Sequence, residues 1–341
     1  MADLTMYNMG HGDCFLINDE NKEGLLIDCG GSRYSSSIVS TFVSPDLLRI
    51  DNKSLMITHF HRDHVNRIKN LDKNIKFKHV YVPNAISSTD IHRAFAIIKY
   101  AKPRSATYIM AYNYLTLIPT IENYLYDGSF IHYVSRFSII TFSFAKFTVL
   151  WPIKINDGDV TTLPFTALEI ELIEKYLSVF SEMKQDEYGS VLEFKTNLNI
   201  DRNIRKIIKE FKDQDKDIQS DGMIKIEMIS QKLGNQLSLV IKDDEKSLFL
   251  GDITHSIYDA EIASYVRPFV GFLKTSHHGS KSHYTSNFPN ADTAFITEIS
   301  SSKTIDYANY NFSRYKNLIV CDPDLGLPGI QYLGNFIKLS Y

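Results

Sequence analysis

The sequence predicts an α/β fold, and two observations support that prediction. Short apolar runs of strand length recur along the chain, and segments with helical periodicity separate many of them. Several of these runs end in a charged residue or a histidine, at the point where a parallel strand delivers its carboxyl end. The length of 341 residues suits one large α/β domain with an insertion, and an apolar content of 44% is enough for a full core.

The amino-acid composition says more about the cellular compartment of the protein than about its substrate. Lysine and arginine number 37 against 40 aspartate and glutamate, so no overall basic field indicates a nucleic-acid partner, although this total would hide a local basic groove. Three cysteines without a Cys-x-x-Cys pair argue against a disulfide framework and a thiolate zinc site. There is no signal-peptide pattern, and no apolar stretch approaches the roughly 20 residues of a membrane span. We therefore expect a soluble cytoplasmic protein.

The chain begins with what reads as three antiparallel strands joined by turns. The expected strands are residues 4–7, 14–17 and 25–28. The first turn carries His11 and Asp13, which are either ordinary turn residues or lie near a metal site. Asp28 ends the third strand, immediately before a Cys-Gly-Gly sequence. Residues 34–50 then have helical character.

The next segment is the most informative in the chain. The run Leu55-Met-Ile57 reads as a buried strand, and it is followed by His59-Phe-His61-Arg-Asp63-His64. Imidazole and carboxylate together suit Zn²⁺, Mn²⁺ or Fe. The alternate spacing of His59 and His61 points both rings the same way, whereas Asp63 and His64 fall on the turn into a helix at about 65–71 and can face a second ion. A loop rich in histidine by chance is the disfavoured alternative.

The middle of the chain is less specific. We expect a strand at 79–82, a helix over 89–101, a tyrosine-rich segment at 105–126 and a hairpin at 130–150. The tyrosines either stack on bases or sugars or form the core and rim of a second layer. From residue 156 to 232 charged residues become frequent and helical periodicity returns. This pattern predicts an insertion that acts as a lid, a dimer contact, a partner surface or an exposed decoration.

The strand pattern resumes after the insertion. Residues 234–241 and 247–252 read as two strands joined by a tight turn, and the second delivers Asp252, a carboxylate well placed to bridge two cations. A strand at 270–276 opens into His277-His278-Gly279-Ser280. His283 follows closely and lies either at the mouth of a site or in solvent. The remaining expected strands are residues 293–297, 318–320 and 336–339.

Taken together, the motifs resemble those of the metallo-β-lactamase-fold hydrolases. The motifs are Asp28-Cys-Gly, His59-x-His61-x-Asp63-His64, Gly251-Asp252 and His277-His278-Gly-Ser280. The chain is most similar to the branch that holds the C-terminal domain of ComEC-type DNA-uptake proteins and the bacterial phosphorylcholine esterases. That branch more usually has Gln where this chain has His11. The resemblance covers roughly residues 4–84 and 234–297.

The resemblance implies a four-layer αβ/βα metallo-β-lactamase sandwich over residues 1–341, with a helical insertion at 156–232. It implies two divalent metal ions, Zn or Mn, between two central sheets. His59 and His61 would hold one ion, Asp63 and His64 the other, Asp252 would bridge them, and His278 would complete the second ion. His277 would then contact the substrate, although the roles of His277 and His278 could be exchanged.

The surrounding residues have implied roles of their own. Asp28 is expected to orient the histidine loop, and Asp13 to lie beside the ligands or the substrate. The third ligand of the first ion is open between Asn235, Ser238 and water, and His132 is the nearest histidine by order. Ser280 and Lys281 are expected at the scissile phosphate.

The implied function is metal-dependent phosphodiester hydrolysis, with nucleic acid as the expected substrate and a metal-activated water as the nucleophile. Asp63 and His277 are the expected catalytic residues. One alternative is a hydrolase of small phosphodiesters or esters, such as a cyclic nucleotide or a choline phosphodiester. Another is a metal-bearing interaction subunit that recruits a protein partner through residues 156–232. No membrane partner is expected. The sequence has no Gly-x-Ser-x-Gly elbow, which excludes a serine hydrolase of that type, and no P-loop, which excludes nucleotide hydrolysis by that route.

Overall fold

A computed structural model describes most of the regions that carry the predicted motifs. The described residues are 2–32, 35–83, 120–153, 235, 237–243, 246–297, 314–321, 331–332 and 336–341. The chain divides into two compact units, and the first contains Met1–Ala85, Tyr124–Lys154 and Asn235–Tyr341. The helix expected at 89–101, most of the tyrosine-rich segment and the insertion at 156–232 lie outside the described residues. The predicted domain organisation therefore stays a prediction.

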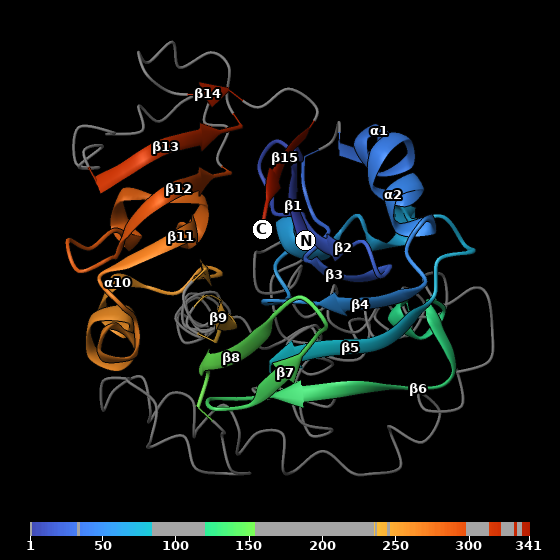
Figure 1. Cartoon of the computed structure of the whole chain (residues 1–341), viewed down its shortest axis with the longest axis horizontal. Helices are drawn as coiled ribbons and strands as arrows, with labels where there is room; N and C mark the ends of the chain where they lie inside the picture. The colour runs from blue at the N-terminus through green and yellow to red at the C-terminus, as the bar shows by residue number, and fades with distance from the viewer. Residues whose placement is uncertain are drawn as a thin grey trace, which may run out of the picture. The chain divides into compact units, whose positions relative to one another are not determined.

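The first sheet has seven strands in the order β15-β1-β2-β3-β4-β5-β6. Their bounds are Ala2–Tyr7 for β1, Phe15–Asp19 for β2, Glu23–Ile27 for β3, Asn52–Met56 for β4, Phe77–Pro83 for β5, Leu125–Val134 for β6 and Phe336–Ser340 for β15. The strands from β15 to β3 pair antiparallel, which confirms the expected meander, and those from β3 to β6 pair parallel. The carboxyl ends of β3 and β4 therefore lie together at one edge (Figure 1).

The second sheet has eight strands in the order β14-β13-β12-β11-β10-β9-β8-β7. Their bounds are Ile139–Thr141 for β7, Lys146–Trp151 for β8, Val240–Asp243 for β9, Ser247–Phe249 for β10, Phe269–Lys274 for β11, Asn290–Ile296 for β12, Tyr315–Val320 for β13 and Gln331–Tyr332 for β14. It too is half antiparallel, from β7 to β10, and half parallel, from β10 to β14. The carboxyl ends of β10, β11 and β12 are thereby aligned.

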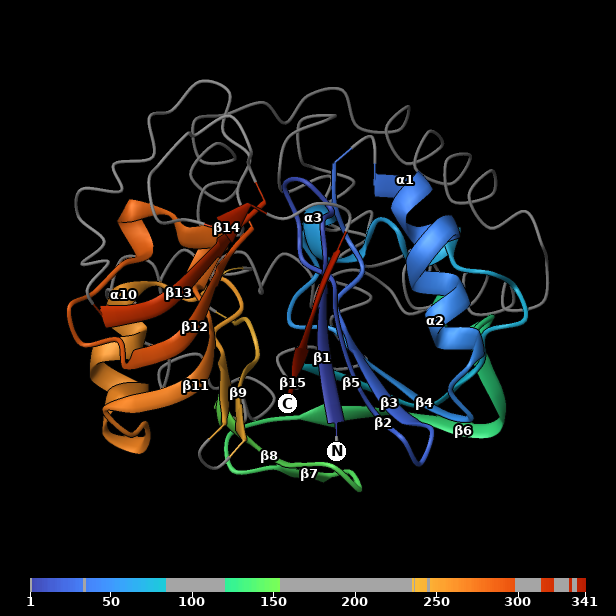
Figure 2. The ribbon, with the colours of Figure 1, turned by 45° about the horizontal axis from the view of Figure 1, so that its top comes forward.

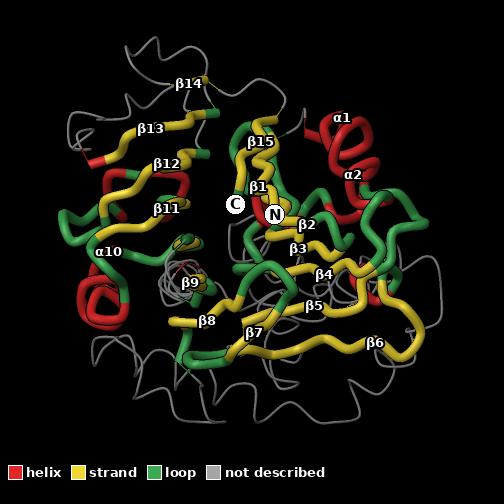
Figure 3. Tube along the Cα trace, viewed as in Figure 1, coloured by secondary structure: helices red, strands yellow, loops and turns green. Residues whose placement is uncertain are grey.

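Helices flank the outer faces of the two sheets within this unit (Figures 2 and 3). The helices α1 (Ser35–Ile38) and α2 (Ser44–Leu48), joined by a π-helical stretch at Val39–Val43, lie beside the first sheet, and α10 (His255–Ile257) lies beside the second. The order of layers is helix, sheet, sheet, helix. Among the described residues, no helix is both long and apolar enough to span a membrane.

The core between the sheets comes from both of them. Met6, Phe15 and Ile27 of the first sheet join one buried cluster with Phe249 and Phe295 of the second. Burying each such side chain stabilises the fold by roughly 1.5–3 kcal/mol. This shared core fixes the facing edges of the sheets, where the motif residues lie.

Two predicted elements differ from the structure. The hairpin expected at 130–150 is confirmed for its second part, where β7 and β8 pair antiparallel in the second sheet, but residues 130–134 belong to β6, which pairs parallel with β5 in the first sheet. Alternating hydrophobicity predicts strands but not their partners, and here the turn at Ser135–Ser138 carries the chain from one sheet to the other. The helix expected from about 65 begins earlier, as α3 (Arg62–Val65), and a 3₁₀ turn at Ile68–Asn70 follows.

Candidate metal centre

The motif residues gather where the carboxyl ends of strands from both sheets face each other. The loop after β4 carries His59, His61, Asp63 and His64, β3 ends before Asp28, β10 ends before Asp252, and β11 leads to His277 and His278. Backbone hydrogen bonds dock the loops together, since the Cys29 N–H donates to the His64 carbonyl and the Asp13 N–H to the Asp63 carbonyl. Only glycine fits at position 30, because a Cβ there would lie 2.2 Å from the Asp63 carbonyl group.

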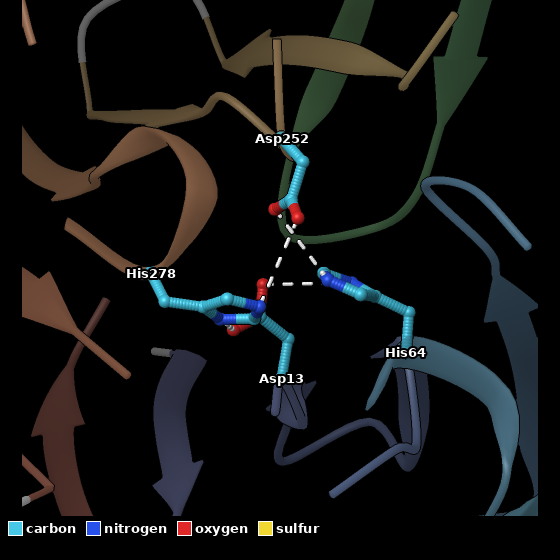
Figure 4. A group of neighbouring side chains, drawn as sticks. All are labelled: Asp13, His64, Asp252 and His278. Atoms are coloured by element: carbon cyan, nitrogen blue, oxygen red, sulfur yellow. Dashed lines mark ion pairs between the residues drawn. The ribbon is translucent and has the colours of Figure 1, made fainter. Parts of the chain in front are cut away.

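Three sets of potential metal ligands result. The loop group is His59, His61 and Asp252; the inner group is Asp13, His64, Asp252 and His278 (Figure 4); the outer group is His11, Asp63 and His278. Within each group the ligand atoms lie within 4.8 Å of one another. Asp252 belongs to both the loop and the inner group. The structure thus brings together every residue that the sequence predicted as a metal ligand.

Buried polar atoms that make no hydrogen bond show that a cation fits here. The Nε2 atoms of His59 and His64 and the Oδ1 atom of Asp252 are buried and make no hydrogen bond. Leaving such atoms unsatisfied is costly in a protein interior. All three belong to the loop or inner group, and nitrogen and carboxylate donors suit Zn²⁺ and Mn²⁺.

The ring of His64 is oriented by Asp28. His64 Nδ1 lies 2.8 Å from Asp28 Oδ2, while Asp28 also accepts from the Thr58 N–H at 2.8 Å and the Thr58 hydroxyl at 2.6 Å. This leaves His64 Nε2 facing Asp252 Oδ1 at 3.4 Å. Asp28 belongs to none of the three groups, so the geometry fits a carboxylate that fixes a ligand's ring.

His278 is held in a similar way from the second sheet. Its Nδ1 lies 2.7 Å from the Thr297 hydroxyl, which in turn donates to Asp13 at 2.6 Å. Its Nε2 lies 2.9 Å from Asp63 Oδ2 and 3.8 Å from Asp252 Oδ2. The anchor at Nδ1 therefore directs Nε2 toward the carboxylates.

His277 points elsewhere, although it precedes His278 directly. Both residues have left-handed backbones, with φ of 45° and 57°. The Nδ1 atom of His277 lies 3.2 Å from Asn235 Nδ2 and 3.0 Å from His283 Nε2. Among the described residues, His277 belongs to no ligand group. His283 is thus at the site, one of the two positions that the sequence left open.

Lys274 is a functional residue that sequence reasoning missed. Its side chain is buried at the end of β11, with Nζ 2.6 Å from Asp13 Oδ2 and 3.5 Å from Asp252 Oδ1. It also donates to the Gly251 carbonyl at 3.1 Å. The signal that could have found it is a single lysine closing an otherwise apolar strand, just before the histidine pair.

The protonation of the histidines differs between the groups. Burial lowers the pKa of His59 well below its usual value and that of His61 to about 4. Burial acts against the charge on His64 and His278 as well, but Asp252 and the neighbouring carboxylates outweigh it. They raise the pKa of His64 well above its usual value and that of His278 to about 9. Lys274 and the histidines hold the pKa of Asp13 well below its usual range, against the opposing effect of burial.

The remaining predicted residues have varied positions. Asn235 Oδ1 and Ser238 Oγ are buried without a hydrogen-bond partner, so the third ligand of the first ion stays open between them and water. Ser280 contacts Ser282 at 3.0 Å, and the side chain of Lys281 lies outside the description. His132 pairs with His79 at 3.0 Å on the first sheet and belongs to no ligand group there. Tyr124 donates to the Leu71 carbonyl and is part of the core.

Comparison with known proteins points to one fold. Residues 7–90, about a quarter of the chain, match the sequence model of the Metallo-beta-lactamase superfamily. No curated protein matches significantly. Solved structures that resemble the chain include the metallo-beta-lactamase fold protein YhfI from Bacillus subtilis, with 9% sequence identity, a TM-score of 0.43 and coverage of 99% of this chain and 100% of that chain. A long form RNase Z from yeast matches with 13% identity, a TM-score of 0.35 and coverage of 94% and 40%.

The match to residues 7–90, together with the two facing mixed sheets and their flanking helices, confirms the predicted metallo-β-lactamase fold. The matched segment includes the whole His59–His64 motif. The similarity to the ComEC-type branch stays a prediction.

Proposed function

We propose that this protein is a metal-dependent phosphodiester hydrolase whose substrate is a nucleic acid. The observation that carries the proposal is the meeting of two ligand groups at one shared carboxylate, Asp252, at the facing edges of the two sheets. His59 and His61 would hold one divalent cation, and His64 and His278 the other. Asp63 lies beside His278 and would complete the second ion.

Two such cations, when bound, would lower the pKa of a water between them and neutralise the charge that develops on the attacked ester. The chain's own residues supply orientation. Asp28 and Thr297 hold the rings of His64 and His278 by their Nδ1 atoms, so both Nε2 atoms face the centre. Asp63 has a side chain that is 24% exposed, whereas Asp13 and Asp252 are buried. It is therefore the carboxylate of the centre that can pass a proton to solvent.

The charge balance of the centre favours an anionic substrate. Asp13, Asp28, Asp63 and Asp252 carry four negative charges, and Lys274 carries one positive charge. Two divalent cations would leave one positive charge in excess. Before the metal-activated water ionises, this excess would attract a phosphodiester monoanion into a partly buried site more strongly than a neutral ester.

His277 is placed to contact the substrate rather than a cation. Asn235 Nδ2 lies 3.2 Å from its Nδ1, and in the tautomer that carries the ring proton on Nε2 this amide would donate to Nδ1. An imidazole N–H beside the centre can donate to a phosphoryl oxygen as charge builds up on it.

A substrate panel tests the proposal. The full chain, loaded with Mn²⁺ or Zn²⁺, is incubated with single- and double-stranded DNA, RNA, a cyclic nucleotide and bis-p-nitrophenyl phosphate, alongside His59→Ala and Asp63→Ala. We expect cleavage of at least one nucleic acid by the wild type and its loss in both variants. If only the cyclic nucleotide or bis-p-nitrophenyl phosphate were cleaved, the substrate would be a small phosphodiester and not a nucleic acid. No cleavage of any substrate, or equal rates in the variants, would refute hydrolysis by this centre.

A further inference from the structure

Lys274 is a buried charge for which the hydrolytic chemistry gives no direct role. Its side chain is 1% exposed, and its partners on the neighbouring strands are Phe249 and Phe295. A buried ammonium group is strongly unfavourable unless carboxylates and carbonyls surround it closely. The fold therefore keeps this charge for a purpose that outweighs its desolvation.

The contacts of Lys274 join the two sheets across the inner group. Asp13 belongs to the loop between β1 and β2 in the first sheet, while Gly251 and Asp252 follow β10 in the second. The Nζ atom contacts all three residues, at 2.6 Å, 3.1 Å and 3.5 Å respectively. Figure 4 shows Asp13 and Asp252 converging on the inner group from opposite sides. One ammonium group thus holds together two carboxylates that would otherwise repel each other.

Among the residues that the structure describes, no other provides this charge permanently. Within the described part of the chain, Lys274 is the one lysine or arginine that forms an ion pair with a carboxylate of the three ligand groups. The other side-chain partners of Asp13 and Asp252 are the neutral Thr297 hydroxyl and histidines, and a histidine cannot keep a proton on a ring nitrogen that binds a metal. The charge of Lys274 alone is the same with and without metal.

We propose that Lys274 is an internal counter-ion, which keeps the inner group assembled when no metal is bound. The folded state then does not require its cations, and a metal ion enters a site that already has its final shape. Without Lys274, Asp13 and Asp252 would lose their lysine counter-ion, and a divalent cation would replace the missing positive charge. Stability would then depend strongly on metal.

Thermal unfolding of full-length variants tests this proposal without any assay of hydrolysis. The midpoint is measured in EDTA and in saturating Mn²⁺ for the wild type, Lys274→Met and the double variant Asp13→Asn/Lys274→Met. We expect metal to raise the midpoint of Lys274→Met by about 10 °C more than that of the wild type, because the variant lacks a buried counter-ion of Asp13 and Asp252 that a bound cation would replace. The double variant removes both charges and should recover most of the midpoint in EDTA.

Lys53→Met is the matched control. Lys53 is a buried lysine at the start of β4, where its ammonium donates to the Ile50 carbonyl and contacts no ligand group. Its replacement should lower both midpoints equally and leave the effect of metal unchanged.

Two results would overturn the role of Lys274. One is an equal effect of metal on the wild type and Lys274→Met. The other concerns the case in which Lys274→Met does not fold even with metal. In that case, a double variant that does not recover its midpoint in EDTA would overturn the role. The inference rests on the metal binding in the proposed function but not on its substrate. Metal content measured on the wild type separates the two, because a wild type that binds no metal refutes the proposed function itself.

Discussion

The loop group and the inner group share Asp252 but differ in how their histidines are charged at neutral pH. His59 and His61 have lowered pKa values because burial dominates, so both rings are neutral and ready to bind a cation. His64 and His278 have raised pKa values because carboxylates surround them, so both are protonated in the metal-free protein. The same burial thus produces opposite charge states, depending on how many carboxylates face each ring.

This difference shows two ways of keeping a metal site folded without metal. Two of the three residues of the loop group, His59 and His61, lie on one continuous segment, and the group gains little repulsion when empty, since Asp252 is its one carboxylate. The inner group draws residues from both sheets and holds two carboxylates, which protons and Lys274 offset. We expect the inner group to be the more sensitive to changes around it.

Removing the shared residue should have the largest effect. In Asp252→Ala both groups lose a ligand, so we expect the protein to bind neither ion and to show no measurable hydrolysis. His61→Ala alters the loop group alone and should retain one ion. Metal content of the purified proteins by mass spectrometry distinguishes the two, and an equal content would contradict the sharing of Asp252.

Disturbing the ring support of His64 should have the next largest effect. Asp28→Asn weakens the charge-assisted contact to His64 Nδ1, and loss of such a partner typically lowers metal affinity by roughly 10- to 100-fold. We expect this loss at one of the two bound ions only, in competition with a chelator. Asp19→Asn, a buried aspartate that contacts Ser143 instead, is the control and should bind metal like the wild type.

The number of protons released on metal binding should also differ between the loop group and the inner group. His278 is protonated below its pKa of about 9 and must lose a proton to bind metal, so the affinity of the inner group should rise by about tenfold per pH unit for each proton released. His61, with a pKa of about 4, is already neutral, so the loop group should show little change above pH 6. Calorimetry in buffers of different ionisation enthalpy counts the protons released. If the binding of each ion released the same number of protons, the proposed difference between the two groups would be wrong.

The same shift affects stability without metal. Because the pKa of His278 is above its unfolded value of about 6.5, its charge stabilises the folded state fully below that pH. This stabilisation is lost as the pH rises through about 9. Unfolding midpoints in EDTA should therefore fall over this interval, and less so in His278→Gln.

The smallest effect is expected in the outer group. His11 Nε2 lies 3.1 Å from Asp63 Oδ2, and the His11 side chain is 45% exposed, so solvent weakens this contact. We expect His11→Gln to lower metal affinity less than tenfold. A larger loss, with a changed absorption spectrum of the Co²⁺-loaded protein, would show that His11 is itself a ligand.

Residues close together in the sequence were the ones that could be predicted. His59 to His64 follow one strand, so spacing alone groups them, and Asp252 is recognisable because a glycine and a strand precede it. For Lys274 the one local signal is a lysine that closes an apolar strand, and its partner Asp13 could not be predicted because it comes from the other sheet. His277 and His278 are identical in type, and only their backbone and side-chain contacts separate their positions. The partners of β6 and β7 likewise depend on a turn that the alternating pattern does not reveal.

The hydrogen bond from Thr297 to Asp13 joins residues that are 284 positions apart. A contact of this kind forms late, because the ends of so long a loop meet only once most of the domain has closed. The geometry around His278 therefore depends on segments from both ends of the chain being in place. Retention of the second ion would serve as a reporter of successful refolding, with no need for a substrate.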